Sequence, residues 1–276
     1  MIKIKITSDT KIKILQAFAG LGFIYTMVWQ FDWRWLIPGL VFGWFLFLLG
    51  HGCSLHKYSS HRSFEPKNVV IKTILLFFGT LITLGSNIGW AATHRKHHKY
   101  SDTPEDPHSP NINRSLWRSI RLWFFYFPTF HVNPRTVKDL TVDPLHKFFH
   151  NHYFKIIIGY IILLAVIDIK LACYFYFVPV VYCFIATGWV VVVTHSPGLN
   201  KFIGYTNFDS GDLTFNSRLG SLISPGDGNH NNHHARPGSA RNKFAKRDWD
   251  FGFWMVKLVG RVPQVNNEER EQKFHI

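Results

Sequence analysis

The histidines are the residues whose type and spacing best suit chemistry in this sequence. The chain contains 16 of them, and eight fall into three tight groups. The groups are a pair, His56 and His61, and two His-x-x-His-His triplets, His94, His97 and His98 and then His230, His233 and His234. Imidazole nitrogens bind Zn, Cu, Fe and Ni. Eight such ligands are more than one ion takes, so the groups predict a site for two metal ions.

The spacing within each group predicts how its rings point. On an α-helix, residues three and four apart share one face, so each triplet is expected to aim its three rings at one point. His56 and His61 are five residues apart. Their rings are expected to diverge at a helix end, toward different metals or different sides.

Long apolar runs indicate what positions these groups. Charged residues make up only 17% of the chain, against roughly 25% in soluble domains. A bilayer core needs about 20 mainly apolar helical residues. Runs of this kind cover residues 14–31, 35–55, 73–93, 153–169 and 171–200. They predict an all-α integral membrane protein rather than a nucleic-acid-binding one, despite the net charge of +14.

The basic residues predict the topology. Lysines and arginines gather on the cytoplasmic side of membrane proteins. They flank the first two runs at Lys13 and Arg62, which makes those runs a hairpin. The segment 70–92 has basic, His-rich flanks on both sides, so it is predicted not to cross. Four spans, approximately 14–31, 35–55, 153–169 and 171–194, then form two hairpins with both termini in the cytoplasm.

The rest of the chain is expected to form a helical, His-rich cytoplasmic cap, residues 56–152 and 195–276. The aromatic and basic segments 117–130 and 249–259 are typical of helices on a membrane surface. No linker divides the sequence, so residues 1–276 are predicted to be a single domain.

Three stretches carry a family resemblance: HKYSSHRSF at 56–64, WAATHRKHHKYS at 90–101 and GDGNHNNHHARPGSAR at 226–241. They resemble the membrane-bound fatty acid desaturases, in particular the stearoyl-CoA (acyl-CoA delta-nine) branch and its bacterial acyl-lipid relatives. DPH at 106–108, DLTVDP at 139–144 and HYF at 152–154 are also similar, and the resemblance covers roughly residues 10–262.

The resemblance implies an O₂-dependent oxidoreductase with two iron ions held by nine histidines, the eight above and His195 at the end of the last span. Such an enzyme introduces a cis double bond into a fatty acyl substrate, an acyl-CoA or an acyl-lipid. The sequence contains no recognisable electron-transfer module, so a separate donor is expected: a ferredoxin, or a b-type cytochrome with its reductase. The alternatives are an acyl or lipid hydroxylase or related oxygenase on the same centre, and a non-catalytic metal-binding membrane protein. A bacterial or viral-host inner membrane is the expected location.

The chain departs from the family pattern at two positions. Val191 stands four residues before His195, where the family usually has an Asn that holds a metal-bound water; Thr194 or a water is a possible substitute. Asp227 stands where Glu is common.

Five further residues are candidates for supporting the ligands or contacting substrate. Asp106 and His108 either do so or form a turn. Asn231 and Asn232 either orient ligands or are solvated loop residues, and Trp189 either lines an acyl tunnel or packs in the membrane helix. The remaining histidines are not assigned as ligands: His51 in the second span, and His131, His146, His150, His152 and His275, which are expected at the surface or the membrane interface.

Overall fold

Two long apolar helices open the chain. The computed structural model describes residues 9–107, 116–125, 133–196 and 198–263. Helix α1 (Asp9–Trp29) turns into α2 (Trp33–Leu46), which begins at the capping side chain of Asp32. Helix α2 then continues without a break into a π-helical stretch, η1 (Phe47–Ser60). The apolar helices Thr10–Trp29 and Trp33–Ser60 are each long enough to cross a membrane.

The second pair of apolar elements is bent. Helices α7 (Pro144–Asn151) and α8 (Tyr153–Ile167) meet at 65°. After Asp168 the chain forms one helix through α9 (Ile169–Ala172), η4 (Cys173–Phe177), α10 (Val178–Gly188) and η5 (Trp189–Val193). In the described part of the chain, three helices are able to cross a membrane by length and composition, or four if the bent pair is one span.

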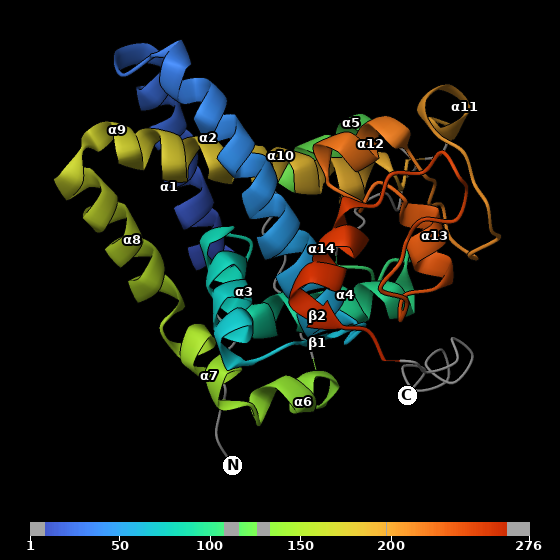
Figure 1. The fold of residues 1–276 in the computed structure, drawn as a ribbon. Helices are drawn as coiled ribbons and strands as arrows, with labels where there is room; N and C mark the ends of the chain where they lie inside the picture. The colour runs from blue at the N-terminus through green and yellow to red at the C-terminus, as the bar shows by residue number, and fades with distance from the viewer. Residues whose placement is uncertain (1–8, 108–115, 126–132, 197, 264–276) are drawn as a thin grey trace.

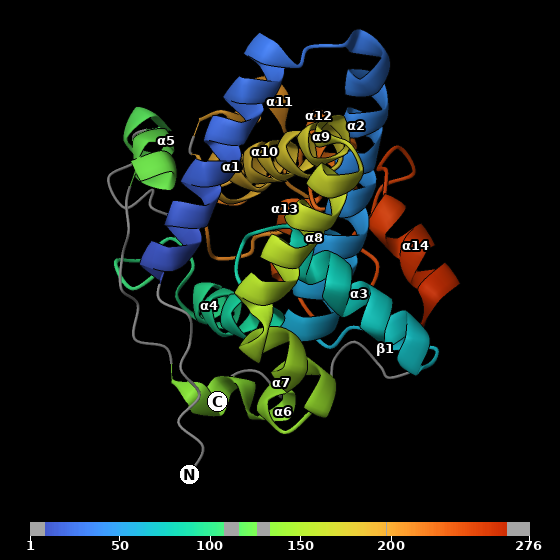
Figure 2. The same cartoon turned by 90° about the vertical axis from the view of Figure 1, so that its left-hand side faces the viewer.

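Helix α10 holds the two pairs together. It packs against both α1 and α2, and Figure 2 shows it passing between them. The turns at the far ends of the pairs are tied by Tyr174. Its hydroxyl accepts a hydrogen bond from the Asp32 amide at 2.6 Å and donates one to the Gln30 carbonyl at 2.7 Å. Large apolar side chains such as Leu21 and Val166, exposed by 67% and 80%, cover the outer faces, as expected where lipid is the solvent.

The segment between the first two histidine groups is broken. Helix α3 (Val69–Leu81) has 13 residues, hence a length of ~20 Å, well short of a bilayer core of ~30 Å. A turn follows, in which Thr83 and Gly85 have positive φ, and α4 (Asn87–Tyr100) begins at the capping side chain of Ser86. That residues 70–92 do not cross the membrane stays a prediction. A helix too short to span the bilayer core agrees with it.

The remaining elements form a cap around α4; in Figure 1, α11, α12 and α13 lie on the right and α6 lies at the bottom. They are β1 (Glu65–Pro66), α5 (Leu116–Phe125), η3 (Pro134–Val137), α6 (Lys138–Thr141), α11 (Asn200–Ile203), α12 (Arg218–Ile223), α13 (His230–Ala235), α14 (Phe251–Val259) and β2 (Gly260–Arg261). Strands β1 and β2 pair antiparallel, with Glu65 opposite Arg261. Helix α14 lies within the predicted segment 249–259, and α5 overlaps the predicted segment 117–130 from residue 117 to 125; residues 126–130 are outside the described part.

Candidate metal centre

Nine imidazole rings converge in two adjacent clusters at the end of the apolar helices. Within each cluster, each ring contributes one nitrogen, and these nitrogens lie within 4.8 Å of one another. Cluster one is His56, His61, His94, His98 and His233; cluster two is His97, His195, His230 and His234. The structure thus brings together all nine histidines that the sequence singled out, with each ring in one cluster only.

The triplets do not aim their rings at one point, and that expectation was wrong. In α4, His94 and His98 belong to cluster one and His97 to cluster two. In α13 the order is reversed, because His233 joins cluster one while its neighbours join cluster two. Residues four apart differ by only ~40° around a helix, whereas adjacent residues differ by ~100°. Each helix therefore lies between the clusters and serves both.

The expectation that His56 and His61 diverge was also wrong, since both rings belong to cluster one. The reason is the π-helical backbone of η1, whose hydrogen bonds join residues five apart. The amide of His61 donates to the carbonyl of His56 at 3.2 Å. The wider turn places residues five apart on one face, so the two rings lie 5.0 Å apart between centroids.

His195 follows the π-helical end of the last apolar helix. Its Nε2 lies 3.0 Å from Nε2 of His230. Val191, four residues earlier, is buried and has no polar atom to offer. The hydroxyl of Thr194 donates to the carbonyl of Val190, so in this structure it faces the backbone and does not replace the missing amide.

Four carboxylates accept hydrogen bonds from the Nδ1 atoms of four of the nine rings. Asp227 accepts from Nδ1 of His56, and Asp106 from Nδ1 of His97. Asp102 and Asp212 accept in the same way from His195 and His234, at 3.0 and 2.6 Å. A carboxylate only accepts hydrogen bonds, so each of these rings carries its proton on Nδ1. Their Nε2 lone pairs are left facing the cluster centres, the arrangement that metal-binding histidines use.

The electrostatics of the clusters fit cations. Burial lowers the pKa of His98, His230 and His233 well below the ordinary imidazole value, so these rings are neutral. Facing Nε2 atoms lie 2.8 to 3.3 Å apart. Ligands at right angles on a metal with bonds of ~2.0–2.1 Å would be ~2.9 Å apart. Lone pairs this close repel one another unless a cation lies between them, so the donor set fits metal ions.

The other site candidates divide. Asp106 accepts hydrogen bonds from Nδ1 of His97 and from the backbone amide of Asp102, each at 2.8 Å. Among the described residues, Asn231 and Asn232 form no hydrogen bond to a ring of either cluster; Asn231 accepts from the Asn207 amide, and Asn232 accepts from the Asn216 side chain and donates to the Asn242 carbonyl. His108 lies outside the described residues.

Trp189 is half-buried in η5. Its indole packs over Gly220, where a Cβ would approach Nε1 to 2.5 Å.

Sequence reasoning missed three of the groups around the rings. His51 is buried, and its Nδ1 donates to Asp227 at 2.8 Å. Asp102 and Asp212 lie in a turn and a loop that meet beside cluster two, where the Leu213 amide donates to the Asp102 carboxylate at 2.8 Å. The one sign of these groups in the sequence was that Asp102 follows closely after the second histidine triplet. The surface assignment was wrong for His146 and His150: both are buried, because α7 packs against α3 and α4, and they contact Ser59 and Ser86.

Comparison with known proteins identifies the family. The model of the fatty acid desaturase family matches residues 32–250. The chain belongs to the fatty acid desaturase family. It is 33% identical over 247 residues to an sn-1 stearoyl-lipid 9-desaturase of Anabaena variabilis, covering 88% of this chain and 87% of the relative.

Two further desaturase relatives match over most of this chain. The sn-1 stearoyl-lipid 9-desaturase of Synechocystis sp. is 34% identical, covering 82% of this chain and 69% of the relative. A hex-5-enoyl-[acyl-carrier protein] acetylenase of Moorena producens is 28% identical, covering 87% and 79%. The protein is accordingly a fatty acyl desaturase, an oxidoreductase of lipid metabolism, and its two histidine clusters are compatible with the metal site of such an enzyme.

Proposed function

We propose that this desaturase holds two iron ions, one in each histidine cluster, and uses O₂ and electrons from a separate donor to introduce a cis double bond into the acyl chain of a membrane glycerolipid. The observation that carries the proposal is the division of nine converging imidazoles into groups of five and four. Imidazole ligands suit several transition metals, and the family narrows the choice to iron.

The protein's own residues would hold the metals and keep them oriented. The four carboxylates would fix the orientation of the rings they contact and keep the N–H proton of each on Nδ1. Their four negative charges match the four positive charges of two divalent ions. When bound, the metals supply the oxidising power that removes hydrogen from an unactivated methylene group, which no side chain provides.

Charge networks around the site support this role. Arg95 joins two histidine-bearing helices: it donates to the Ser59 and Ser60 carbonyls at the end of η1 and to both carboxylate oxygens of Asp139. Bidentate Arg–carboxylate pairs are geometrically specific. Arg95 would therefore keep His56 and His61 in register with His94 and His98.

Two of the most similar relatives and the apolar surface support a lipid-linked substrate, although other relatives are named for acyl-CoA. Two relatives are named for stearoyl groups on lipids, whereas a third is named for an acyl carrier protein. A lipid-linked chain would reach the site from within the bilayer. We therefore propose a glycerolipid acyl group as the substrate of this chain, with Trp189 as a candidate for contact with that group.

The membrane topology completes the proposal. The helices Thr10–Trp29, Trp33–Ser60 and Ile169–Val193 would cross the bilayer, and the bent pair α7–α8 would supply the fourth span. The histidine clusters and both termini would lie on the cytoplasmic side of a bacterial inner membrane. Soluble electron donors are then within reach of the cap.

The test is a lipid analysis of a bacterial host that expresses this protein with a ferredoxin and its reductase. Gas chromatography–mass spectrometry of separated lipid classes should reveal a new monounsaturated acyl group in glycerolipids. His97→Ala should abolish it. His152→Ala is the matched control, because the His152 ring contacts Phe148 and belongs to neither cluster, so its loss should leave the product unchanged. A hydroxylated acid would favour the oxygenase alternative, and no product from iron-loaded protein would refute the proposal.

A further inference from the structure

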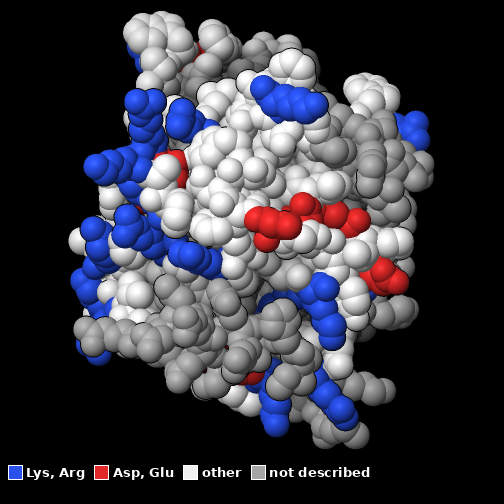
Figure 3. All heavy atoms as spheres, turned by 90° about the vertical axis from the view of Figure 1, so that its right-hand side faces the viewer, with Lys and Arg blue, Asp and Glu red and all other residues white. Residues whose placement is uncertain are grey.

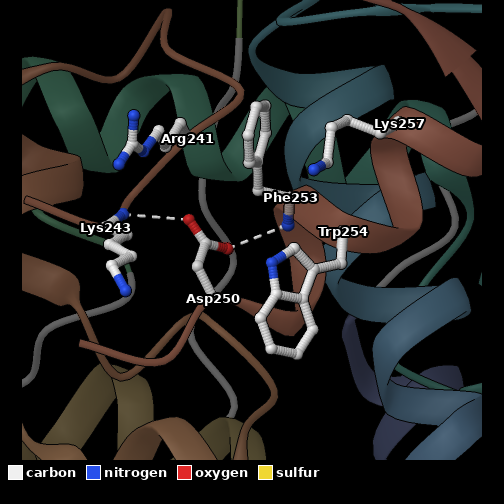
Figure 4. A pocket seen from close by; sticks show the side chains of 6 residues that line it. All are labelled: Arg241, Lys243, Asp250, Phe253, Trp254 and Lys257. Carbon is white, nitrogen blue, oxygen red and sulfur yellow. Dashed lines mark hydrogen bonds between the residues drawn. The ribbon is translucent and has the colours of Figure 1, made fainter. Parts of the chain in front are cut away.

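A basic pocket lies outside the metal centre, between α14 and the loop that precedes it. Its volume is about 300 Å³. The lining residues are Arg241, Lys243, Asp250, Phe253, Trp254 and Lys257 (Figure 4). Three cations and two aromatic rings thus surround a single carboxylate.

The single carboxylate can offset only one of the three positive charges, and its hydrogen bonds come from backbone amides and not from the lining cations. Asp250 caps α14 through the Phe253 amide at 2.9 Å and accepts from the amides of Asn242 and Lys243 at 2.7 and 2.9 Å. Figure 4 shows two of these bonds converging on its two oxygens. Three hydrogen bonds from amides stabilise its charge in place.

The cations have no acidic partner of their own. Across residues 9–107, 116–125, 133–196 and 198–263, none of the three lining cations forms an ion pair with an Asp or Glu. The Lys243 amine donates to the Lys246 carbonyl, and the Lys257 amine lies 5.3 Å from the centre of the Phe253 ring. The pocket therefore carries positive charge that an anion would balance.

The surroundings of the pocket indicate where the anion comes from. Trp254 and Leu258 of α14 are 58% and 66% exposed, and Trp249 is 48% exposed just before it. Along one edge of the face in Figure 3, lysines and arginines gather apart from the carboxylates at its middle. Exposed aromatic rings among cations are characteristic of the head-group layer of a bilayer.

Helix α14 is also fixed to the membrane helices. Phe251 packs edge-on against Trp44 of α2, with centroids 5.2 Å apart. Gly252 lies against η1, where a Cβ would approach Cε of Lys57 to 3.1 Å. The pocket is therefore held at a set distance from the apolar spans.

We propose that this pocket binds the phosphate of an anionic glycerophospholipid, with the glycerol and upper acyl chains lying along Trp254 and Leu258. Arg241 and Lys257 would hold the phosphate, since guanidinium and ammonium groups donate charge-assisted hydrogen bonds to its oxygens. The proposal concerns a bilayer lipid and does not rest on the iron site, so either assignment can fail without the other.

The experiment is a native mass spectrometry titration of the full-length protein in a neutral detergent. The probes are phosphatidylglycerol, a phosphate-free galactosyl diacylglycerol with the same acyl chains, and inorganic phosphate. Phosphatidylglycerol should bind as one tight adduct that weakens as ionic strength rises. Galactolipid should not compete with it, and neither should inorganic phosphate at the same concentration.

Variants assign the adduct to the pocket. Each cation near a membrane surface is worth about fivefold in binding anionic lipid, so Arg241→Gln with Lys257→Gln should weaken the binding of phosphatidylglycerol by about 25-fold. Lys138→Gln with Lys201→Gln is the matched control, because these exposed lysines do not line the pocket. Arg241→Lys with Lys257→Arg keeps the charge and should retain binding.

Three results would overturn the proposal: equal binding of galactolipid, displacement by equimolar inorganic phosphate, or equal losses in the two glutamine variants. If the pocket variant does not fold, the probe series on the unmodified protein decides, because it needs no substitution.

Discussion

Replacing Asp227 by Asn tests whether the carboxylates orient the metal ligands. Asp227 is fully buried and accepts from Nδ1 of His51 at 2.8 Å and of His56 at 3.1 Å. Burial alone would raise the pKa of this carboxyl, but contact with His56 and His51 lowers it far below its ordinary range. Asp227 is therefore ionised, and Asn is nearly isosteric with it. The substitution removes the charge and one acceptor without creating a cavity.

The magnitude follows from the hydrogen bonds. Asn keeps one acceptor oxygen and points an N–H₂ group at the other ring, so one of the two charge-assisted bonds is lost. Such a bond contributes about 1.5–3 kcal/mol. That range corresponds to roughly a 10- to 150-fold loss in affinity for the metal of cluster one. Substitutions of groups that hold metal-bound histidines typically cost about 10- to 100-fold, in agreement.

The assay is iron retention during a graded chelator titration, read by mass spectrometry of the metal. Asp227→Asn should release one iron at a much lower chelator concentration than the unmodified protein and keep the other. The matched control is Asp248→Asn. Asp248 is equally buried and accepts from the amides of Phe244 and Ala245, but it touches no histidine of either cluster. Unchanged iron retention in Asp227→Asn, or equal loss in Asp248→Asn, would refute the reasoning.

Four further outcomes are expected. Asp106→Asn should weaken the iron of cluster two instead, because its carboxylate holds His97; a chelator titration that shows loss from cluster one would contradict this. His51→Phe should lower iron retention less than Asp227→Asn does, since the ring stacked on Phe47 is kept and only one hydrogen bond is lost; a larger effect in the same titration would count against it. Burial lowers the pKa of His98 and His233 in cluster one, whereas Asp102 raises the pKa of His195 in cluster two, so protons should compete with the metal of cluster one only well below pH 6.5; dialysis at pH 6.5 should leave the iron of cluster one bound, and more acidic buffer should release it. Gly226→Ala should lower the unfolding temperature more than Gly211→Ala. Both glycines have positive φ, but of the two only Gly226 is placed so that an added Cβ would meet Asp250, at 2.9 Å. Equal shifts in a thermal melt would contradict the steric argument.

Eight of the nine histidines that converge could be singled out from the sequence because their spacing carries the information. Three tight groups stand out among the 16 histidines, whereas His195 was included only because of the resemblance to the desaturase family. The apolar runs likewise predicted the long helices, whose bounds follow the runs closely. These features depend on period and composition, which are local properties of a sequence.

The division of the rings between two clusters could not be predicted. It depends on the π-helical backbone of η1, which places His56 and His61 on one face, and on where α4 and α13 lie relative to each other. The period of a helix is assumed when its faces are assigned, and a π-helical stretch changes that period. His97 and His98 then belong to different clusters although they are neighbours in the chain.

The role of two of the carboxylates could not be predicted, for a different reason. Asp102 and Asp212 lie 110 residues apart and meet the clusters through turns, with Asp102 at φ 59°. Such positions carry no periodic signal. The burial of His146 and His150 was missed because it depends on the packing of α7 against α3 and α4, which only the assembled fold reveals.

The account's central claim is that the two clusters each hold one iron. Its most direct test is the iron content per chain of the active protein, measured by inductively coupled plasma mass spectrometry alongside amino-acid quantification. The account predicts two irons per chain, and one in variants that dismantle a single cluster. One iron or none in a preparation with full desaturase activity, or a different metal in its place, would contradict it.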